Sequence, residues 1–170
     1  METPATRQPR IIGVVSDTHG HVAYTRQGLQ MLESFEVEAV LHCGDIGGAE
    51  VVPLFARWPT HFVLGNVDLY EPELETAIRA AGQQFHGRFG RLQLGGRRIA
   101  LVHGDDFHAL AAAVASAEHD LVCTGHTHLA KQERRGATLV LNPGALYRAQ
   151  PHTVAIVDLE TLEATHLRVD

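Results

Sequence analysis

The 170-residue sequence has only two cysteines, Cys43 and Cys123, and no CxxC pair. It therefore gives no support to a structural zinc site built on thiolates. Both cysteines stand in apolar, strand-like runs, which predicts small buried side chains. The sequence offers no reason for a disulfide between them, and it leaves that pairing open.

Basic residues are also few, with 14 Lys and Arg against 20 Asp and Glu, and the net charge is -6. Binding to a nucleic-acid polymer needs clustered Lys and Arg, so we do not expect it. No apolar run reaches the roughly 18 residues of a membrane helix, and the first residues lack a charged-then-apolar signal pattern. We therefore expect no membrane partner and, by default, a cytoplasmic location.

Apolar residues make up 45% and charged residues 20% of the chain, both ordinary for a globular domain with a real core. Residues 1–9 are polar, carry two prolines and show no periodicity, which predicts a disordered tail. Residues 10–170 show no repeat and no linker. They are expected to form a single domain.

The first half of the chain alternates strands and helices. Strands are predicted at 10–16, 38–42 and 61–64, and helices at 21–36, 48–57 and 71–81, where Pro72 stands in the first turn. Such alternation implies βαβ units and a largely parallel sheet.

The second half is expected to be antiparallel in character. Gly95-Gly96 predicts a tight turn between strands at 89–94 and 97–102. A helix at 106–117 and strands at 120–124, 128–134, 138–142, 153–159 and 165–169 follow. The fold class is α/β, with two mixed β-sheets packed together and flanked by helices as a four-layer α/β/β/α sandwich.

Histidine is abundant, with 12 residues, and several stand beside Asp, Asn or Gly. In open α/β sheets, sites form in the loops beyond the carboxyl ends of strands. Five polar clusters occupy such positions: Asp17-Thr18-His19, Gly44-Asp45, Gly65-Asn66-Val67-Asp68, His103-Gly104-Asp105 and Gly125-His126-Thr127-His128.

These clusters supply seven metal-ligand candidates: Asp17, His19, Asp45, Asn66, His103, His126 and His128. One such cluster alone is common in ordinary turns, and a single strand-end histidine is more often a surface residue. Five in this order favour a metal site. Seven N and O donors are too many for one Zn²⁺, but they fit two first-row divalent ions when one carboxylate bridges them. Mn²⁺ is favoured, with Fe²⁺, Zn²⁺, Ni²⁺ or Co²⁺ as alternatives.

The order DxH, GD, GNxD, HG, GHTH resembles that of the calcineurin-like metallophosphoesterases, in particular their small single-domain bacterial and archaeal phosphodiesterases. The resemblance runs over residues 11–159 and implies the two-sheet metallophosphoesterase fold. It assigns one metal to Asp17, His19 and His128, and the other to Asn66, His103 and His126. Asp45 bridges the two.

The sequence departs from the family pattern at three positions. Val67 stands where many members have the histidine that protonates the leaving group, and valine cannot transfer a proton. Asp105 replaces a frequent histidine, and Ala145 replaces the serine of an NPGS turn. Each departure bears on substrate preference and leaving-group chemistry, and none removes a ligand.

The resulting hypothesis is a hydrolase that cleaves a small phosphodiester, rather than a monoester, by attack of a metal-bridging hydroxide. Asp45, His103 and Asp68 are the catalytic candidates, with Asp68 expected to orient Asn66 or a ligand imidazole or to handle protons with Asp105. Asn66 and Arg148 are expected to bind the substrate; an exposed loop arginine is the equal alternative for Arg148.

The alternative from another class is a non-catalytic, metal-binding protein-interaction scaffold of the same fold, for which Trp58 or Tyr147 would seed the partner surface. The sequence lacks the HxHxDH run of metallo-β-lactamases and the GxGxxG of dinucleotide-binding domains. A homo-oligomer is also expected, because small two-sheet domains often pair, although no single residue carries that expectation.

Overall fold

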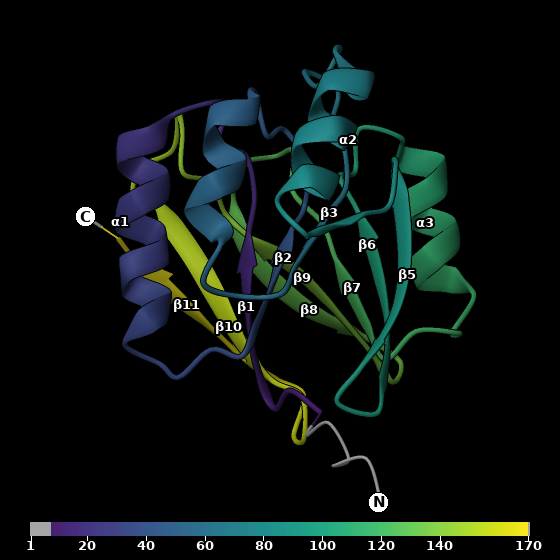
Figure 1. Ribbon diagram of the computed structural model, residues 1–170. Helices are drawn as coiled ribbons and strands as arrows, with labels where there is room; N and C mark the ends of the chain where they lie inside the picture. Colours follow the sequence, from purple (N-terminus) through teal and green to yellow (C-terminus); the bar gives the residue numbers. More distant parts are fainter. Residues whose placement is uncertain (1–7, 170) are drawn as a thin grey trace, which may run out of the picture.

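Eleven strands form two mixed sheets in the computed structural model, which describes residues 8–169 (Figure 1). The six-stranded sheet has the order β11 (Glu163–Arg168), β10 (Thr153–Asp158), β1 (Ile11–Val15), β2 (Ala39–His42), β3 (Thr60–Phe62), β4 (Gln84–Phe85). The five-stranded sheet has the order β5 (Phe89–Leu94), β6 (Arg97–Val102), β7 (Leu121–Cys123), β9 (Thr138–Pro143), β8 (Ala130–Arg135).

Helices cover the outer faces of both sheets. They are α1 (Val22–Glu33), the 3₁₀ helix η1 (Ala49–Phe55), α2 (Glu71–Ala80) and α3 (Phe107–Ala115). Figure 1 shows α1 and α3 on opposite sides of the sheets. Three buried apolar clusters fill the interfaces: one between the sheets, one under α1, η1 and α2, and a small one under α3. The predicted four-layer sandwich is confirmed.

Local sequence explains where several elements begin and turn. The Asp106 carboxylate accepts a hydrogen bond from the amide of Ala109 and caps α3. Pro72 stands in the first turn of α2, where a missing N–H costs nothing. Gly95 and Gly96 both have positive φ and join β5 to β6 in the predicted hairpin.

Three details differ from the sequence-based expectations. The helix predicted at 48–57 is the 3₁₀ helix η1, because Pro53 inside it cannot donate an α-helical hydrogen bond. The two-residue edge strand β4 was not predicted, since it is too short to show a period. The second half is not antiparallel throughout. Strands β6 and β7 pair in parallel because α3 connects them as a crossover, and β7 pairs in parallel with β9 because the chain runs through the edge strand β8 between them.

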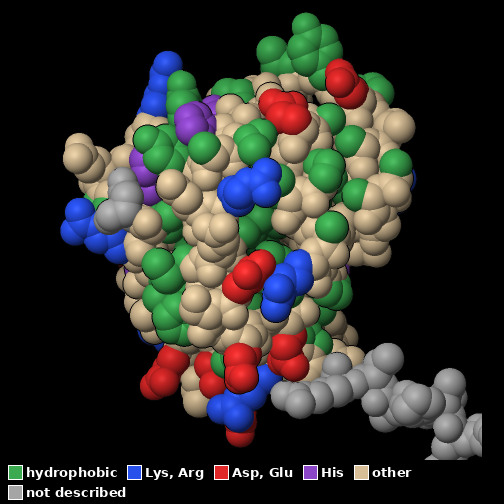
Figure 2. Space-filling model, turned by 60° about the vertical axis from the view of Figure 1, so that its left-hand side comes forward, with side chains coloured by type: hydrophobic (Ala, Val, Ile, Leu, Met, Phe, Trp, Pro, Cys, Tyr) green, Lys and Arg blue, Asp and Glu red, His purple; other side chains and the backbone are tan. Residues whose placement is uncertain are grey.

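Most of the predicted tail, residues 1–7, lies outside the described residues. Within residues 8–169, Cys43 and Cys123 are buried and free, and no helix is long and apolar enough to cross a membrane. On the face in Figure 2, Lys and Arg side chains are interspersed with Asp and Glu rather than gathered into a patch.

Candidate metal centre

The five polar clusters follow strands whose carboxyl ends point to one edge of the sandwich. Strands β1, β2 and β3 are parallel neighbours in one sheet, and β6 and β7 are parallel neighbours in the other. The loops after them therefore meet above the inter-sheet core. Asp17 and His19 follow β1, Asp45 follows β2, Asn66 follows β3, His103 follows β6, and His126 and His128 follow β7.

A first group of candidate ligands surrounds the carboxylate of Asp17. Its Oδ1 atom lies 3.2 Å from Nε2 of His128 and 3.7 Å from Nε2 of His19. The ligating atoms of these three residues all lie within 4.8 Å of one another. Nε2 of His19 also lies 3.5 Å from Oδ2 of Asp45. This spacing suits one divalent ion held by imidazole nitrogen and carboxylate oxygen.

A second group surrounds the other oxygen of Asp45. Oδ1 of Asp45 lies 3.3 Å from Nε2 of His103. That same His103 nitrogen is 3.2 Å from Oδ1 of Asn66, which is in turn 3.1 Å from Nδ1 of His126. Two imidazole nitrogens and two oxygens thus face a common space, and Asp45 presents one oxygen to each group.

Two buried polar atoms of the site have no hydrogen-bond partner among the described residues: Oδ1 of Asp17 and Nε2 of His19. The other oxygen of Asp17 accepts from the Ser16 hydroxyl at 2.5 Å and from the His126 amide at 3.1 Å. Orphaned buried polar atoms are costly and call for an explanation. A bound cation supplies one, so these residues fit a metal.

The remaining ring nitrogens of two histidines are held by backbone carbonyls. Nδ1 of His103 donates to the carbonyl of Cys43 at 2.8 Å, and Nδ1 of His128 donates to that of Arg148 at 3.2 Å. Such contacts fix the tautomer that leaves Nε2 unprotonated and free to ligate, as in known metal-bound histidines.

Most of the candidate ligands have a strained backbone. A positive φ is uncommon outside glycine and costs energy that the surrounding structure must offset. Five of the seven have φ between 45° and 68°: Asp17, His19, Asp45, His126 and His128. Strain of this kind gathers at functional sites, where it aims side chains inward.

The electrostatics of the site follow from packing carboxylates against imidazoles. Burial raises the pKa of Asp17 and of Asp45. The neighbouring histidines, together with the Ser16 hydroxyl at Asp17 and the Val67 amide at Asp45, outweigh burial, so the net pKa of each carboxyl is lowered. For His103, burial lowers the pKa, and Asp45 and Asp17 outweigh burial and raise it. The site thus concentrates negative charge that a cation can neutralise.

His42 supports the site, although the sequence analysis assigns it no role beyond ending a strand. The hydroxyl of Thr18 donates to the carbonyl of Ile46 at 2.9 Å, so Nε2–H of His42 donates to Thr18 at 3.0 Å. Nδ1 accepts from the amide of Gly44 at 3.2 Å. Burial lowers the pKa of His42 to about 3, which keeps it neutral. Its place just before Gly44-Asp45 was the available signal.

Asp68 is buried and accepts three backbone hydrogen bonds. They come from Gly65 at 2.8 Å, Gly47 at 2.9 Å and Ile46 at 3.1 Å. The expected contact with Asn66 or an imidazole is therefore replaced by contacts with amides, because the loops after β2 and β3 turn their N–H groups toward this carboxylate. Asp68 ties the loop of Asp45 to the loop of Asn66.

Arg148 is exposed at the margin of the site. Its guanidinium lies 5.2 Å from the ring centre of Tyr147, and that ring lies 5.2 Å from the ring of His19. The backbone of Arg148 receives the hydrogen bond from His128. Asp105 is also exposed, one residue beyond Gly104.

The chain is similar to known proteins over nearly its whole length. A model of the calcineurin-like phosphoesterase superfamily domain matches residues 11–162. A phosphodiesterase of Methanocaldococcus jannaschii is 29% identical over 157 residues, covering 89% of this chain and 95% of the relative. A solved archaeal phosphodiesterase is 28% identical with a TM-score of 0.86, covering 93% of this chain and 99% of that one.

Vacuolar protein sorting 29 from Cryptosporidium parvum is 19% identical with a TM-score of 0.66, over 95% of this chain and 97% of its own. At that identity it shares the fold alone. The family match spans nearly all of the described chain and includes every loop that carries a candidate ligand. The chain belongs to the calcineurin-like phosphoesterase superfamily.

Proposed function

We propose that this protein is a two-metal phosphodiesterase. The observation that carries the proposal is the position of Asp45, whose Oδ2 lies 3.5 Å from His19 and whose Oδ1 lies 3.3 Å from His103. A carboxylate that presents one oxygen to each of two ligand groups has the geometry of a bridging ligand.

The ligands divide between the two groups by their contacts. Asp17, His19 and His128 would hold one divalent ion with Oδ2 of Asp45. Asn66, His103 and His126 would hold the other with Oδ1 of Asp45. Two divalent ions supply charge neutralisation at the phosphoryl oxygens and lower the pKa of water. Nitrogen and oxygen donors without thiolate suit first-row divalent ions such as Mn²⁺, Fe²⁺ and Zn²⁺, and we propose Mn²⁺ among them.

Other residues position the reactants rather than transfer protons. Asp68 holds the loops of Asp45 and Asn66 together through backbone amides, so its role in the reaction is that of a positioning residue. Arg148 would bind a phosphate oxygen with its exposed guanidinium. Val67, 40% exposed beside Asp45, offers no proton to a leaving group. Substrates with good leaving groups are therefore favoured.

Diester hydrolysis is preferred over monoester hydrolysis because a similar curated protein and a similar solved structure are named phosphodiesterases. The scaffold alternative has less support. Trp58, one proposed seed of a partner surface, is buried and donates to the carbonyl of Val37 at 2.9 Å.

The test is hydrolysis of bis(4-nitrophenyl) phosphate by protein stripped with chelator and refilled with Mn²⁺. We expect activity to return with the metal. Asp45→Asn should lower the activity by more than about 100-fold, because loss of a residue that only supports a metal ligand already lowers activity by about 10–100-fold. Asp120→Asn is the matched control, since it makes the same change at the far end of β7. No turnover by folded protein with any divalent ion would contradict the proposal.

A further inference from the structure

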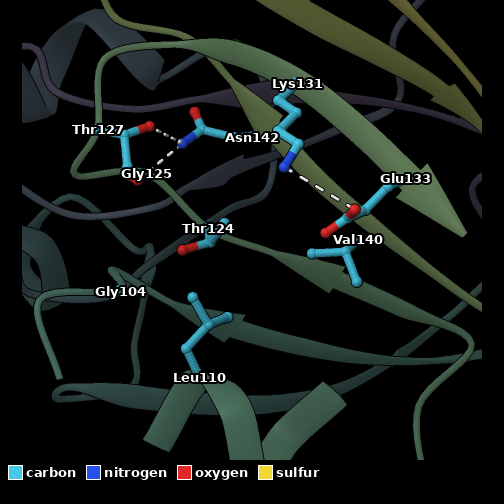
Figure 3. A pocket seen from close by; sticks show the side chains of 9 residues that line it. All are labelled: Gly104, Leu110, Thr124, Gly125, Thr127, Lys131, Glu133, Val140 and Asn142. Atoms are coloured by element: carbon cyan, nitrogen blue, oxygen red, sulfur yellow. Dashed lines mark hydrogen bonds and ion pairs between the residues drawn. The ribbon is translucent and has the colours of Figure 1, made fainter. Parts of the chain in front are cut away.

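The segment that follows β9 carries an arginine to the edge of the metal centre. Near the end of β9, the side-chain nitrogen of Asn142 donates to the carbonyl of Gly125 at 2.7 Å and to the Thr127 hydroxyl at 3.0 Å (Figure 3). Leu146 is fully buried, and its amide donates to the carbonyl of Ser16 at 3.4 Å. The segment is therefore anchored to two loops that carry candidate ligands, those after β7 and β1.

Arg148, the arginine of this segment, is fixed through its backbone to a candidate ligand. Its carbonyl accepts a hydrogen bond from Nδ1 of His128 at 3.2 Å, and Nε2 of the same ring lies 3.2 Å from Oδ1 of Asp17. Only one imidazole ring thus separates the Arg148 backbone from the carboxylate of the first ligand group. Its φ of 48° is the strained backbone that five of the candidate ligands share.

The guanidinium of Arg148 is exposed, and within the part of the chain that the structure describes no carboxylate pairs with it. Several other arginines do pair with a carboxylate: Arg10, Arg57, Arg79, Arg98 and Arg135. The Arg148 side chain is held instead by Tyr147, whose ring centre lies 5.2 Å from Cζ. A ring face attracts a cation at this distance without neutralising it. The charge of Arg148 is therefore left for an anion.

The Tyr147 ring is itself held by two histidines. Its centre lies 5.2 Å from that of the His19 ring and 5.9 Å from that of the His21 ring, with interplanar angles of 37° and 31°. Both distances are those of favourable ring pairs. His21 is fixed in turn, because its Nδ1 accepts from the amide of Tyr24 at 3.3 Å and caps α1. Tyr147 thus connects a candidate metal ligand to the guanidinium of Arg148.

The first ligand group opens to solvent at the residues that Tyr147 and Arg148 contact. The side chains of His19 and His128 are 18% and 23% exposed, whereas that of Asp17 is fully buried. The two histidine rings lie 5.3 Å apart. A phosphate that enters from solvent and binds at this group therefore lies beside both histidines. One of them contacts the Tyr147 ring and the other the Arg148 backbone.

We propose that Tyr147 is a positioning residue for substrate binding. Its ring holds the guanidinium of Arg148 beside the first ligand group, where the guanidinium binds a non-bridging oxygen of the substrate phosphate. The inference rests on the proposed function, which gives Arg148 that phosphate contact, and it adds the residue that prepares the contact. A free arginine side chain loses rotamer freedom when it binds, and one already held against a ring loses less. The ring face is what acts, and the Tyr147 hydroxyl is not needed.

Replacements at Tyr147 separate the ring face from the bulk of the side chain. They are compared through kcat/KM for bis(4-nitrophenyl) phosphate with Mn²⁺-loaded protein. Tyr147→Phe keeps the face and should stay close to the wild type. Tyr147→Leu keeps an apolar side chain without the face and should lose about 2- to 5-fold, the worth of an exposed contact between a cation and a ring. Arg57→Ala is the matched control and should change nothing, because its Cζ lies 5.8 Å from the Trp58 ring before the amino end of β3.

A double-mutant cycle with Arg148→Ala tests whether Tyr147 acts through Arg148. Arg148→Ala should lower kcat/KM by about 10-fold or more, as loss of a charge-assisted hydrogen bond typically does. Tyr147→Leu should lower it no further in the Arg148→Ala background, because the guanidinium that the ring positions is gone. A residue that only packs against His19 would give additive losses and a weaker Kd for Mn²⁺. Additive losses, or a Tyr147→Leu protein equal to the wild type, would overturn the inference and leave the proposed function standing.

Calorimetric titration of inorganic phosphate into the Mn²⁺-loaded protein measures the same positioning without turnover. We expect the phosphate Kd to rise in Tyr147→Leu and in Arg148→Ala, again without adding in the double variant. The Mn²⁺ Kd should be equal in the wild type, Tyr147→Phe and Tyr147→Leu. A phosphate Kd that Tyr147→Leu leaves unchanged contradicts the inference. If no diester is hydrolysed, the proposed function fails, and the phosphate titration still decides whether Tyr147 positions Arg148.

Discussion

Nε2 of His103 lies 3.3 Å from Oδ1 of Asp45, and this contact joins the two sheets at the candidate metal centre. His103 extends from β6 of one sheet, and Asp45 from β2 of the other. Removal of the metal should therefore loosen the junction between the sheets as well as abolish the activity.

Metal binding should stabilise the folded chain. At a free Mn²⁺ concentration of about 100 times its Kd, binding adds about 2.7 kcal/mol. For a chain of this size, the melting temperature should then rise by about 5–10 °C. Differential scanning calorimetry of the stripped and refilled protein measures the shift. Asp120→Asn should keep it and Asp45→Asn should lose most of it; an equal shift in both variants would argue against Asp45 as a ligand.

His42 should affect metal affinity indirectly, through its hydrogen bonds to the loops that carry the candidate ligands. His42→Leu leaves the Gly44 amide and the Thr18 hydroxyl short of a buried partner, at about 1–3 kcal/mol each. We expect lower stability and a weaker Kd for Mn²⁺ by calorimetric titration, partly rescued by His42→Gln. Ile78→Ala, on the buried face of α2, is the control that loses stability alone. Equal Mn²⁺ affinity in both variants would reduce His42 to a packing residue.

Position 67 should determine the leaving groups that the enzyme tolerates. The Val67 amide donates to Asp45 at 3.1 Å, so a histidine there would lie beside the reacting phosphate. General acids contribute about 100- to 10,000-fold. Val67→His should therefore raise kcat for diethyl phosphate, followed by ³¹P NMR, much more than for bis(4-nitrophenyl) phosphate. Leu69→His, on the same exposed loop, should change neither. A uniform gain for both substrates would count against the missing-acid explanation.

The His61–His86 pair should make stability fall in mild acid. Nδ1 of His61 lies 2.9 Å from Nε2 of His86. Burial, and then the charge of His86, lowers the pKa of His61 to about 4, below its ordinary 6.5. The unfolded chain therefore binds the proton first, and stability is lost as pH falls from 6.5 toward 4, by about 1–3 kcal/mol.

Urea unfolding of the wild type and His61→Gln at several pH values isolates this contribution, because other titrating groups are common to both. The slope of the free energy of unfolding against pH should be shallower in His61→Gln over this window. His108→Gln, an exposed change on α3, should follow the wild type. Parallel curves for the wild type and His61→Gln would remove His61 as the cause.

Much of the fold could be read from local sequence because local chemistry encodes it. Gly95-Gly96 predicted the β5–β6 hairpin, and Pro72 predicted the start of α2. The alternation of strands and helices in the first half predicted its parallel strands. The strand order of the second half could not be read in this way. The parallel pairing of β6 with β7 depends on the crossover through α3, and that of β7 with β9 depends on the placement of β8 at the sheet edge; no local pattern records either.

The sequence by itself determined which residues could ligate a metal, because five polar clusters follow five predicted strands in a recognisable order. Only the tertiary structure decided which atoms meet. In the folded chain, Oδ1 and Oδ2 of Asp45 face different histidines. Asp68 accepts hydrogen bonds from backbone amides, and the neutral His42 hydrogen-bonds to Thr18 in another loop. Those contacts join segments distant in the chain, so they are set by the packing of the two sheets and not by any local spacing.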